Sequence, residues 1–87
     1  MNKREQELYG ILQEEAAEVI QAVSKMFRFG NTERNQKDLN QEIGDFIGVL
    51  KLLHDEKYLD GEGLIKAAEK KIKKLDVYMT NKRKSSK

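Results

Sequence analysis

Four carboxylates interrupt the apolar faces of two amphipathic segments of this chain. In the first segment, apolar residues recur at helical spacing, and Glu15 falls in the middle of the apolar stripe with Glu18 at its edge. In the second, Glu42 falls inside the apolar face and Asp45 lies toward its border. An ionised carboxylate facing a core is costly unless a cation compensates it, and converging carboxylates repel one another. The pattern therefore predicts a cation site.

The available ligands indicate which kind of cation this is. No basic residue lies centrally in either stripe, the nearest being Lys25, Lys51 and Lys71. The chain has no Cys and a single histidine, His54, which excludes a thiolate or imidazole-rich zinc site. Carboxylates spaced i and i+3 on two helices suit octahedral Mg²⁺, for which Mn²⁺ can substitute. From spacing alone, the alternative is that these carboxylates flank the helix seam and reach water.

Three amphipathic helices are needed to position these residues. Periodicity predicts a first helix over residues 4–27, ended by Gly30, and a break over residues 29–32. A second helix is predicted to begin within residues 32–40 and to end near His54. A third helix follows a glycine-containing turn, and its apolar face, which no carboxylate interrupts, consists of Leu64, Ile65, Ala68, Ile72, Leu75 and Met79.

Length and composition predict one all-α domain. Eighty-seven residues without Pro, 38% hydrophobic and 37% charged, are typical of helices with wide solvated faces, so we expect one domain over residues 1–80 and a basic, disordered tail over residues 81–87. Three helices make a thin core, which predicts a homodimer or homotetramer that completes the bundle. No apolar run resembles a signal peptide or a membrane span, so a cytoplasmic location without a membrane partner is expected.

The acidic motifs resemble those of a known superfamily. Glu14–Glu18, followed after 23 residues by Glu42–Asp45, is similar to the Glu-Glu-x-x-Glu…Glu-x-x-Asp signature of the all-α nucleoside triphosphate pyrophosphohydrolases. The segment Lys25–Gly30 resembles that of the short MazG-like proteins often encoded by phages, which would place the protein in a host cytoplasm. The resemblance covers residues 12–79, most of the chain, and implies a MazG-like helical bundle.

The resemblance also implies an activity and a set of site residues. The reaction would be Mg²⁺-dependent hydrolysis of a nucleoside triphosphate between the α and β phosphates, giving a monophosphate and pyrophosphate. The family's metal ligands correspond to Glu15, Glu18, Glu42 and Asp45. Glu14, one step round the helix, would orient a water or a ligand. The proton acceptor stays open between Glu14 and Glu18.

Three cations are candidates for binding the phosphates. Lys25 and Arg28 lie three residues apart at the end of the first predicted helix, where their other role would be to offset the helix macrodipole. Lys71 would close over the phosphates or remain a solvated lysine. Phe29, beside the break, would stack on a base or cover the core. The sequence does not indicate which nucleotide is the substrate, because a neighbouring subunit is expected to supply part of the base pocket.

Two other classes of function fit parts of the sequence. A helical dimerisation or interaction module would use the same carboxylates in salt bridges between helices and would not catalyse turnover. A nucleic-acid-binding protein would use the basic tail from Lys82 to Lys87, but without this tail the chain is slightly acidic, which weakens that interpretation.

Overall fold

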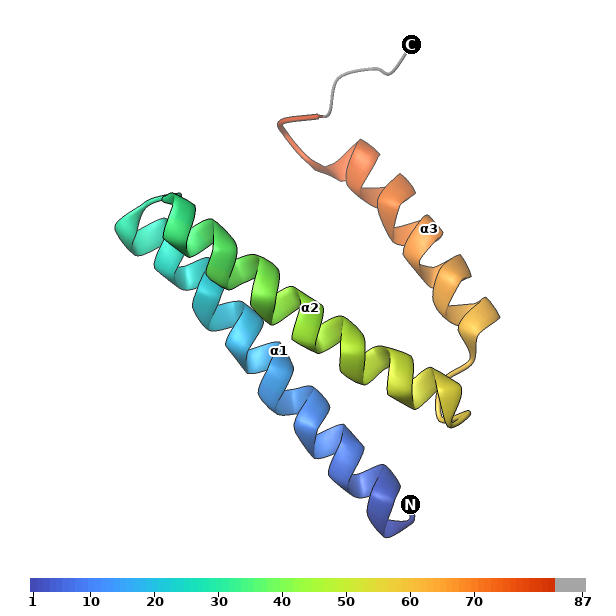
Figure 1. Cartoon of the computed structure of the whole chain (residues 1–87). Helices are drawn as coiled ribbons and strands as arrows, with labels where there is room; N and C mark the ends of the chain where they lie inside the picture. The colour runs from blue at the N-terminus through green and yellow to red at the C-terminus, as the bar shows by residue number, and fades with distance from the viewer. Residues whose placement is uncertain (83–87) are drawn as a thin grey trace.

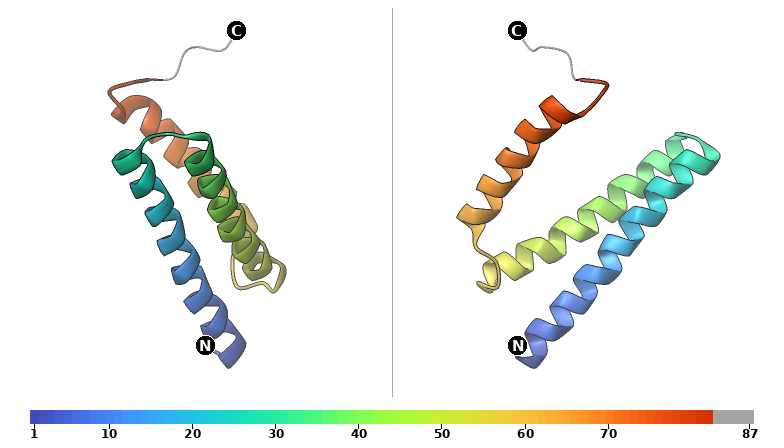
Figure 2. Two further views of the ribbon diagram at one scale, coloured as in Figure 1. Left: turned by 60° about the vertical axis from the view of Figure 1, so that its left-hand side comes forward. Right: turned by 180° about the vertical axis from the view of Figure 1, so that it is seen from behind.

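The computed structural model describes residues 1–82, which form three helices and no strand. They are α1 (Lys3–Phe29), α2 (Glu33–Asp55) and α3 (Gly61–Tyr78). Figure 1 shows α1 and α2 side by side as an antiparallel hairpin, and the right-hand view of Figure 2 shows α3 diverging from α2 beyond their connection. The predicted all-α fold of three main helices is confirmed. Of the predicted tail, residues 83–87 lie outside the described residues.

Helix α1 begins and ends at side chains suited to those positions. The Asn2 side-chain oxygen accepts a hydrogen bond from the Glu5 backbone N–H at 2.7 Å, which satisfies one of the free donors of the first turn. The helix continues to Phe29, two residues beyond the predicted end, so Phe29 belongs to the helix and not to the break. It stops at Gly30, whose φ of 102° is a conformation that other residues rarely adopt.

Helix α2 starts and stops near the predicted residues. Thr32 Oγ1 accepts a hydrogen bond from the Asn35 N–H at 3.1 Å and caps the first turn. At the other end, Lys57 adopts a positive φ of 67°, and the Tyr58 N–H reaches back to the Leu53 carbonyl at 2.8 Å. The Lys57 N–H donates to the His54 carbonyl at 3.0 Å, so the pair of bonds forms a Schellman motif in which Lys57 takes the usual place of glycine.

A small apolar core joins the two helices of the hairpin. Leu53 is fully buried and packs in one cluster with Leu8 and Val49, while Ala22 is buried further along the helix pair. Several partly buried residues pack against this cluster, namely Tyr9, Ile11, Leu12, Tyr58 and Leu59. At the open end of the hairpin, Arg4 binds both carboxylate oxygens of Glu56 and thereby lowers the pKa of Glu56.

We expect Leu53→Ala to destabilise the protein by about 3 kcal/mol, because it leaves a cavity at the one fully buried large side chain among the described residues. Its neighbour Leu52 is 44% exposed and supplies a matched control, for which Leu52→Ala should cost about 1 kcal/mol or less. Urea unfolding followed by circular dichroism measures both changes. Equal losses in the two variants would contradict the assignment of Leu53 to the core.

Helix α3 buries none of its residues. Its predicted apolar face is present but uncovered, with Ile65 62% and Ile72 49% exposed. Met79 lies beyond the helix end in an extended conformation, so the predicted face stops at Leu75 within the helix. The Lys82 ammonium group reaches back to the carbonyls of Val77 and Met79 and compensates the free acceptors of this terminus. None of the helices in residues 1–82 has the length and hydrophobicity needed to cross a membrane.

Candidate metal centre

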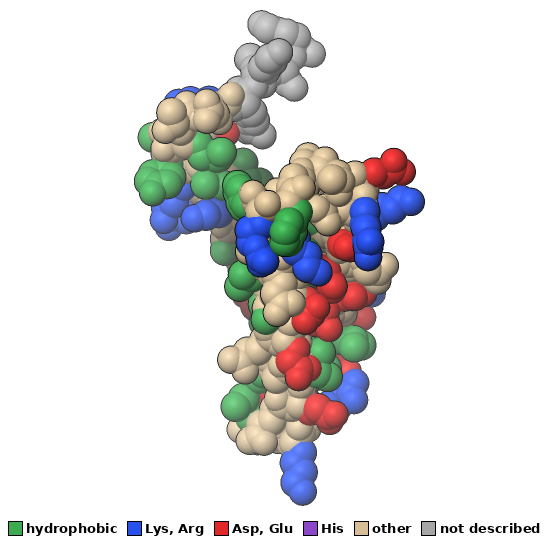
Figure 3. Space-filling view, turned by 90° about the vertical axis from the view of Figure 1, so that its left-hand side faces the viewer, with side chains coloured by type: hydrophobic (Ala, Val, Ile, Leu, Met, Phe, Trp, Pro, Cys, Tyr) green, Lys and Arg blue, Asp and Glu red, His purple; other side chains and the backbone are tan. Residues whose placement is uncertain are grey.

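The hairpin brings together carboxylates from both of its helices. Glu15 of α1 and Glu42 and Asp45 of α2 each place one oxygen so that all three oxygens lie within 4.8 Å of one another. Glu15 and Glu42 are partly buried, and Asp45 is exposed at the edge of the group. In Figure 3, acidic side chains gather in a band along the hairpin, and basic side chains gather near its turn. We call Glu15, Glu42 and Asp45 the carboxylate cluster.

The helical period explains why these side chains face one another. Glu42 lies seven residues before Val49 and eleven before Leu53, and both of these residues are buried in the hairpin. Glu42 therefore lies on the face of α2 that packs against α1. On α1, Glu15 lies seven residues after Leu8 and seven before Ala22, which are also buried. Both glutamates consequently occupy positions where an apolar residue would complete the core.

The surroundings of Glu42 disfavour the charged form of its carboxylate. The pKa of Glu42 is raised, chiefly because partial burial removes water from its carboxylate, and further because Glu18, Asp45, Glu15 and Asp38 add negative charge around it. Among the described residues, no Lys or Arg forms an ion pair with Glu15, Glu42 or Asp45, or with Glu18. The region therefore holds concentrated negative charge without a protein cation to balance it.

Glu18 and Glu14 do not belong to the carboxylate cluster. Glu18 is exposed and lies outside the 4.8 Å group, although its charge contributes to the raised pKa of Glu42. Glu14 is exposed on α1 and also lies outside the group. The structure thus gathers three of the four predicted metal ligands, and the roles assigned to Glu18 and Glu14 stay predictions.

Two residues of α2 near the cluster were not predicted. Asp38 adds its charge to the surroundings of Glu42, and Gln41 donates a hydrogen bond from Nε2 to Asp45 Oδ1 at 3.0 Å, which orients that carboxylate. The spacing contained a signal for both, because Asp38 lies four residues before Glu42 and Gln41 lies four residues before Asp45. Neither residue interrupts an apolar stripe, so the apolar pattern of the sequence does not indicate them.

The oxygen donors of the cluster are of the type that a small divalent cation binds. Oxygen ligands on opposite sides of one octahedral Mg²⁺ lie about 4.2 Å apart, since each Mg–O bond is about 2.1 Å long. The three oxygens of the cluster all lie within 4.8 Å of one another, so small side-chain movements would bring them to one such ion. Three carboxylates and no nitrogen or sulfur ligand also match the preference of Mg²⁺ and Mn²⁺ for hard oxygen donors. Glu15, Glu42 and Asp45 are the residues that would hold the ion.

The predicted phosphate-binding cations lie in different parts of the fold. Lys25 is seven residues after Glu18, so it lies on the same side of α1 about 10 Å nearer the hairpin turn. Arg28 is exposed at the last turn, with its guanidinium 4.8 Å from the centre of the Phe29 ring. Phe29 is 65% exposed and does not cover the core. Lys71 is on α3, apart from the hairpin, and its role stays a prediction.

The raised pKa of Glu42 has a measurable consequence in metal-free protein. A carboxyl whose pKa is higher in the folded state binds its proton more tightly there, so its contribution to stability grows as the pH falls through that pKa. We expect Glu42→Gln, which removes the charge, to melt at a higher temperature than wild type at about pH 7 in EDTA. The difference should shrink toward about pH 4. Melting curves across this range measure it, and a difference that widens in acid would contradict the prediction.

Comparison with known proteins adds no further identification of this site. No family model, curated protein or solved structure matches the chain. The resemblance of Glu14–Glu18 and Glu42–Asp45 to a family signature therefore stays a prediction from the sequence.

Proposed function

We propose that the protein is a Mg²⁺-dependent nucleoside triphosphate pyrophosphohydrolase of the MazG-like type. The observation that carries the proposal is the convergence of Glu15, Glu42 and Asp45 from two helices, without a Lys or Arg ion pair among residues 1–82 to neutralise them. The motif resemblance supplies the reaction class, cleavage between the α and β phosphates. The cluster is consistent with it, because a triphosphate can approach these carboxylates only if their charge is balanced.

Different residues of the hairpin would have different roles in such a reaction. A bound Mg²⁺ would neutralise negative charge on the phosphates and lower the pKa of a bound water. Glu15, Glu42 and Asp45 would hold the ion, and Gln41 would keep the Asp45 carboxylate oriented. Glu18 is close enough to influence Glu42 and is exposed to solvent, which suits a group that accepts a proton from water.

The cations at the turn of the hairpin would bind the part of the substrate beyond the cluster. Lys25 shares one side of α1 with Glu18, so the phosphate chain would extend from the cluster toward Lys25. Arg28 and the exposed ring of Phe29 lie one turn further along the helix. A guanidinium and an aromatic ring there would offer a phosphate contact and a stacking surface for the base.

The second candidate is a helical interaction module without catalysis. The uncovered apolar residues of α3 favour it, because large exposed apolar surfaces mark interaction sites. Its account of the acidic residues is weaker, since it assigns them to salt bridges between helices. The interhelix ion pair of the hairpin in the described residues joins Arg4 to Glu56 instead, away from Glu15 and Glu42.

The proposal is tested by incubating the purified protein with a panel of ribo- and deoxyribonucleoside triphosphates and Mg²⁺. Separation of the products distinguishes monophosphate plus pyrophosphate from diphosphate plus phosphate. We expect monophosphate and pyrophosphate from at least one substrate, with no turnover in EDTA. Diphosphate and phosphate as products would overturn the reaction class. No turnover of any nucleotide would favour the interaction module.

A further inference from the structure

Helix α3 has one face that is made of lysines. Each residue of a helix turns by about 100°, so residues 66, 70, 73 and 74 fall within an arc of about 100° around the helix axis. All four are Lys, and all four are exposed. Within residues 1–82, none of them forms an ion pair with an acidic residue. We call Lys66, Lys70, Lys73 and Lys74 the lysine face.

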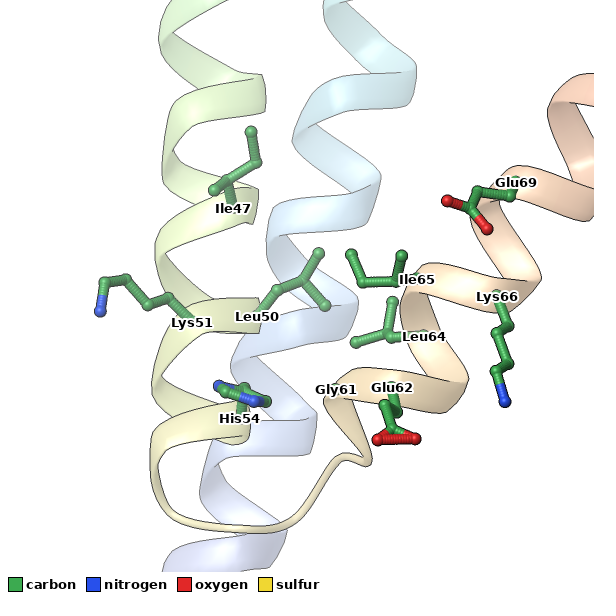
Figure 4. Close-up of a pocket in the computed structure, with 10 residues that line it drawn as sticks. All are labelled: Ile47, Leu50, Lys51, His54, Gly61, Glu62, Leu64, Ile65, Lys66 and Glu69. Atoms are coloured by element: carbon green, nitrogen blue, oxygen red, sulfur yellow. The ribbon is translucent and has the colours of Figure 1, made fainter.

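The lysine face points away from the hairpin. It lies opposite the apolar stripe of α3, because the centres of the two arcs are about 180° apart. A groove of about 790 Å³ lies between α2 and the start of that stripe. In Figure 4, Leu64 and Ile65 point toward α2, whereas the ammonium group of Lys66 points away from it. A ligand of the lysine face therefore approaches α3 from the side that the hairpin leaves open.

The positive charge of the chain is concentrated in its C-terminal part. Residues 1–60 contain 12 Asp or Glu and eight Lys or Arg, whereas residues 61–87 contain three Asp or Glu and nine Lys or Arg. The three acidic residues are Glu62, Glu69 and Asp76, and all of them lie outside the arc of the lysine face. The lysine face therefore attracts a polyanion, although the whole chain carries a net charge of only +2.

The position of the lysines excludes an anionic membrane as the polyanion that best fits α3. A helix that lies on a bilayer buries its apolar face and uses cations beside that face to contact the lipid headgroups. The lysine face is on the opposite side of α3 and would point into water. The borders of the apolar stripe carry Lys71 on one side and Asp76 on the other. A bilayer could not contact the stripe and the lysine face together.

The residues within the arc favour a double-stranded nucleic acid over a single strand. Besides the lysines, the arc contains Gly63 and Val77, so it offers no aromatic ring on which unpaired bases could stack. It also contains no Arg, Asn or Gln, whose planar groups make paired hydrogen bonds to one base edge. Lysine ammonium groups bind phosphates as point charges. Contacts of this kind hold a duplex without reading its sequence.

The dimensions of the lysine face fit B-form DNA. The helix rises by about 12 Å from Lys66 to Lys74. An α-helix with its side chains is about 10–12 Å across, and the major groove of B-form DNA is about 12 Å wide. Lys73 and Lys74 lie at opposite edges of the arc, so they extend toward opposite walls of such a groove. The major groove of duplex RNA is too narrow to admit a helix.

We propose that α3 binds double-stranded DNA through its lysine face, with contacts to the phosphates and without preference for sequence. The carboxylate cluster takes no part in this binding, because it lies on the hairpin and repels phosphates when no metal is bound. The binding is a second function of the chain and is independent of nucleotide hydrolysis. It also leaves the apolar stripe of α3 uncovered by the ligand.

Fluorescence anisotropy with a labelled duplex DNA of 20 base pairs tests the proposal, with EDTA present so that no metal bridges phosphates to the cluster. We expect a dissociation constant of about 1–100 µM at about 0.15 M salt. The triple variant Lys66→Gln/Lys70→Gln/Lys74→Gln should bind at least about 10-fold more weakly. Its plot of log affinity against log salt concentration should be less steep than that of wild type by about 2.7, since each lost phosphate contact removes about 0.9.

Two further proteins show whether the lysine face itself carries the binding. Lys3→Gln/Arg34→Gln/Lys37→Gln removes the same charge from exposed residues of the hairpin and should bind as wild type does. Deletion of residues 83–87 should preserve the difference between wild type and the triple variant of α3. Equal weakening by the hairpin control would overturn the proposal, as would wild-type binding by the triple variant of α3. Far-ultraviolet circular dichroism checks that the helices of each variant are intact.

A panel of other polyanions identifies the ligand class. The probes are a second duplex DNA of different sequence, a duplex RNA, a 20-nucleotide single strand and phosphatidylserine vesicles. We expect equal affinity for the two DNA duplexes, and affinity for the RNA duplex, the single strand and the vesicles that is weaker by about 10-fold or more. Tighter binding of wild type to any of these three than to duplex DNA, or no binding to duplex DNA at about 200 µM protein, would overturn the proposal.

Discussion

Glu42→Gln is expected to reduce nucleoside triphosphate hydrolysis by about 100-fold or more, the scale of loss when one group that supports charge stabilisation at a reaction centre is removed. Glu42 belongs to the carboxylate cluster and lies on the face of α2 that packs against α1. The amide keeps the shape of the side chain but removes the negative charge that would hold Mg²⁺. Initial rates of pyrophosphate release, measured at saturating Mg²⁺, give the size of the effect.

Glu7→Gln is the matched control for this variant. Glu7 is an exposed glutamate of α1 that lies outside the carboxylate cluster, so its substitution makes the same change of charge without touching the site. We expect wild-type rates from Glu7→Gln. Hydrolysis by Glu42→Gln at close to the wild-type rate would contradict the proposed site, and equal losses in both variants would show an effect of net charge.

Mg²⁺ is expected to stabilise the folded protein by binding the cluster. A ligand that binds only the folded state at 100 times its dissociation constant adds about 2.7 kcal/mol to the free energy of unfolding. For a domain of this size that amount corresponds to a rise of about 10 °C or more in the melting temperature. The effect should be nearly absent in Asp45→Asn and Glu42→Gln, since each removes a ligand charge of the cluster. Differential scanning fluorimetry with and without Mg²⁺ measures it.

Two controls separate metal binding from general screening. NaCl at matched ionic strength weakens the repulsion around Glu42 without coordinating the carboxylates, so it should give a much smaller shift than Mg²⁺. EDTA should reverse the Mg²⁺ effect in full. Equal shifts from NaCl and Mg²⁺ would mean that the carboxylates are solvated charges, as the interaction module requires.

Helix content and most helix ends follow from local sequence. Gly30 ends α1 because it alone tolerates the positive φ found there, and Thr32 starts α2 because its hydroxyl accepts a backbone hydrogen bond. The end of α2 is harder to predict from the sequence, because the residue that adopts the left-handed conformation there is Lys57 and not the usual glycine. The residues around Phe29 predict a turn that includes it, whereas the helix continues through Phe29 and ends only where the backbone changes conformation at Gly30.

The positions of Glu15 and Glu42 on core-facing surfaces were also determined by the sequence. The helical period assigns each residue to a face of its own helix, and the three-residue connection between α1 and α2 makes the two helices antiparallel neighbours. The sequence therefore predicts that the two glutamates converge. The period does not specify how far one helix is shifted along the other.

Only the tertiary structure decided which carboxylates meet and where α3 lies. The axial alignment of α1 and α2 brings Asp45 within reach of Glu15 and leaves Glu18 outside the group, and it adds the charge of Asp38 to the surroundings of Glu42. The sequence shows that α3 has an apolar stripe but not what covers it. The hairpin of the same chain buries none of the residues of α3, because α3 diverges from α2 beyond their connection.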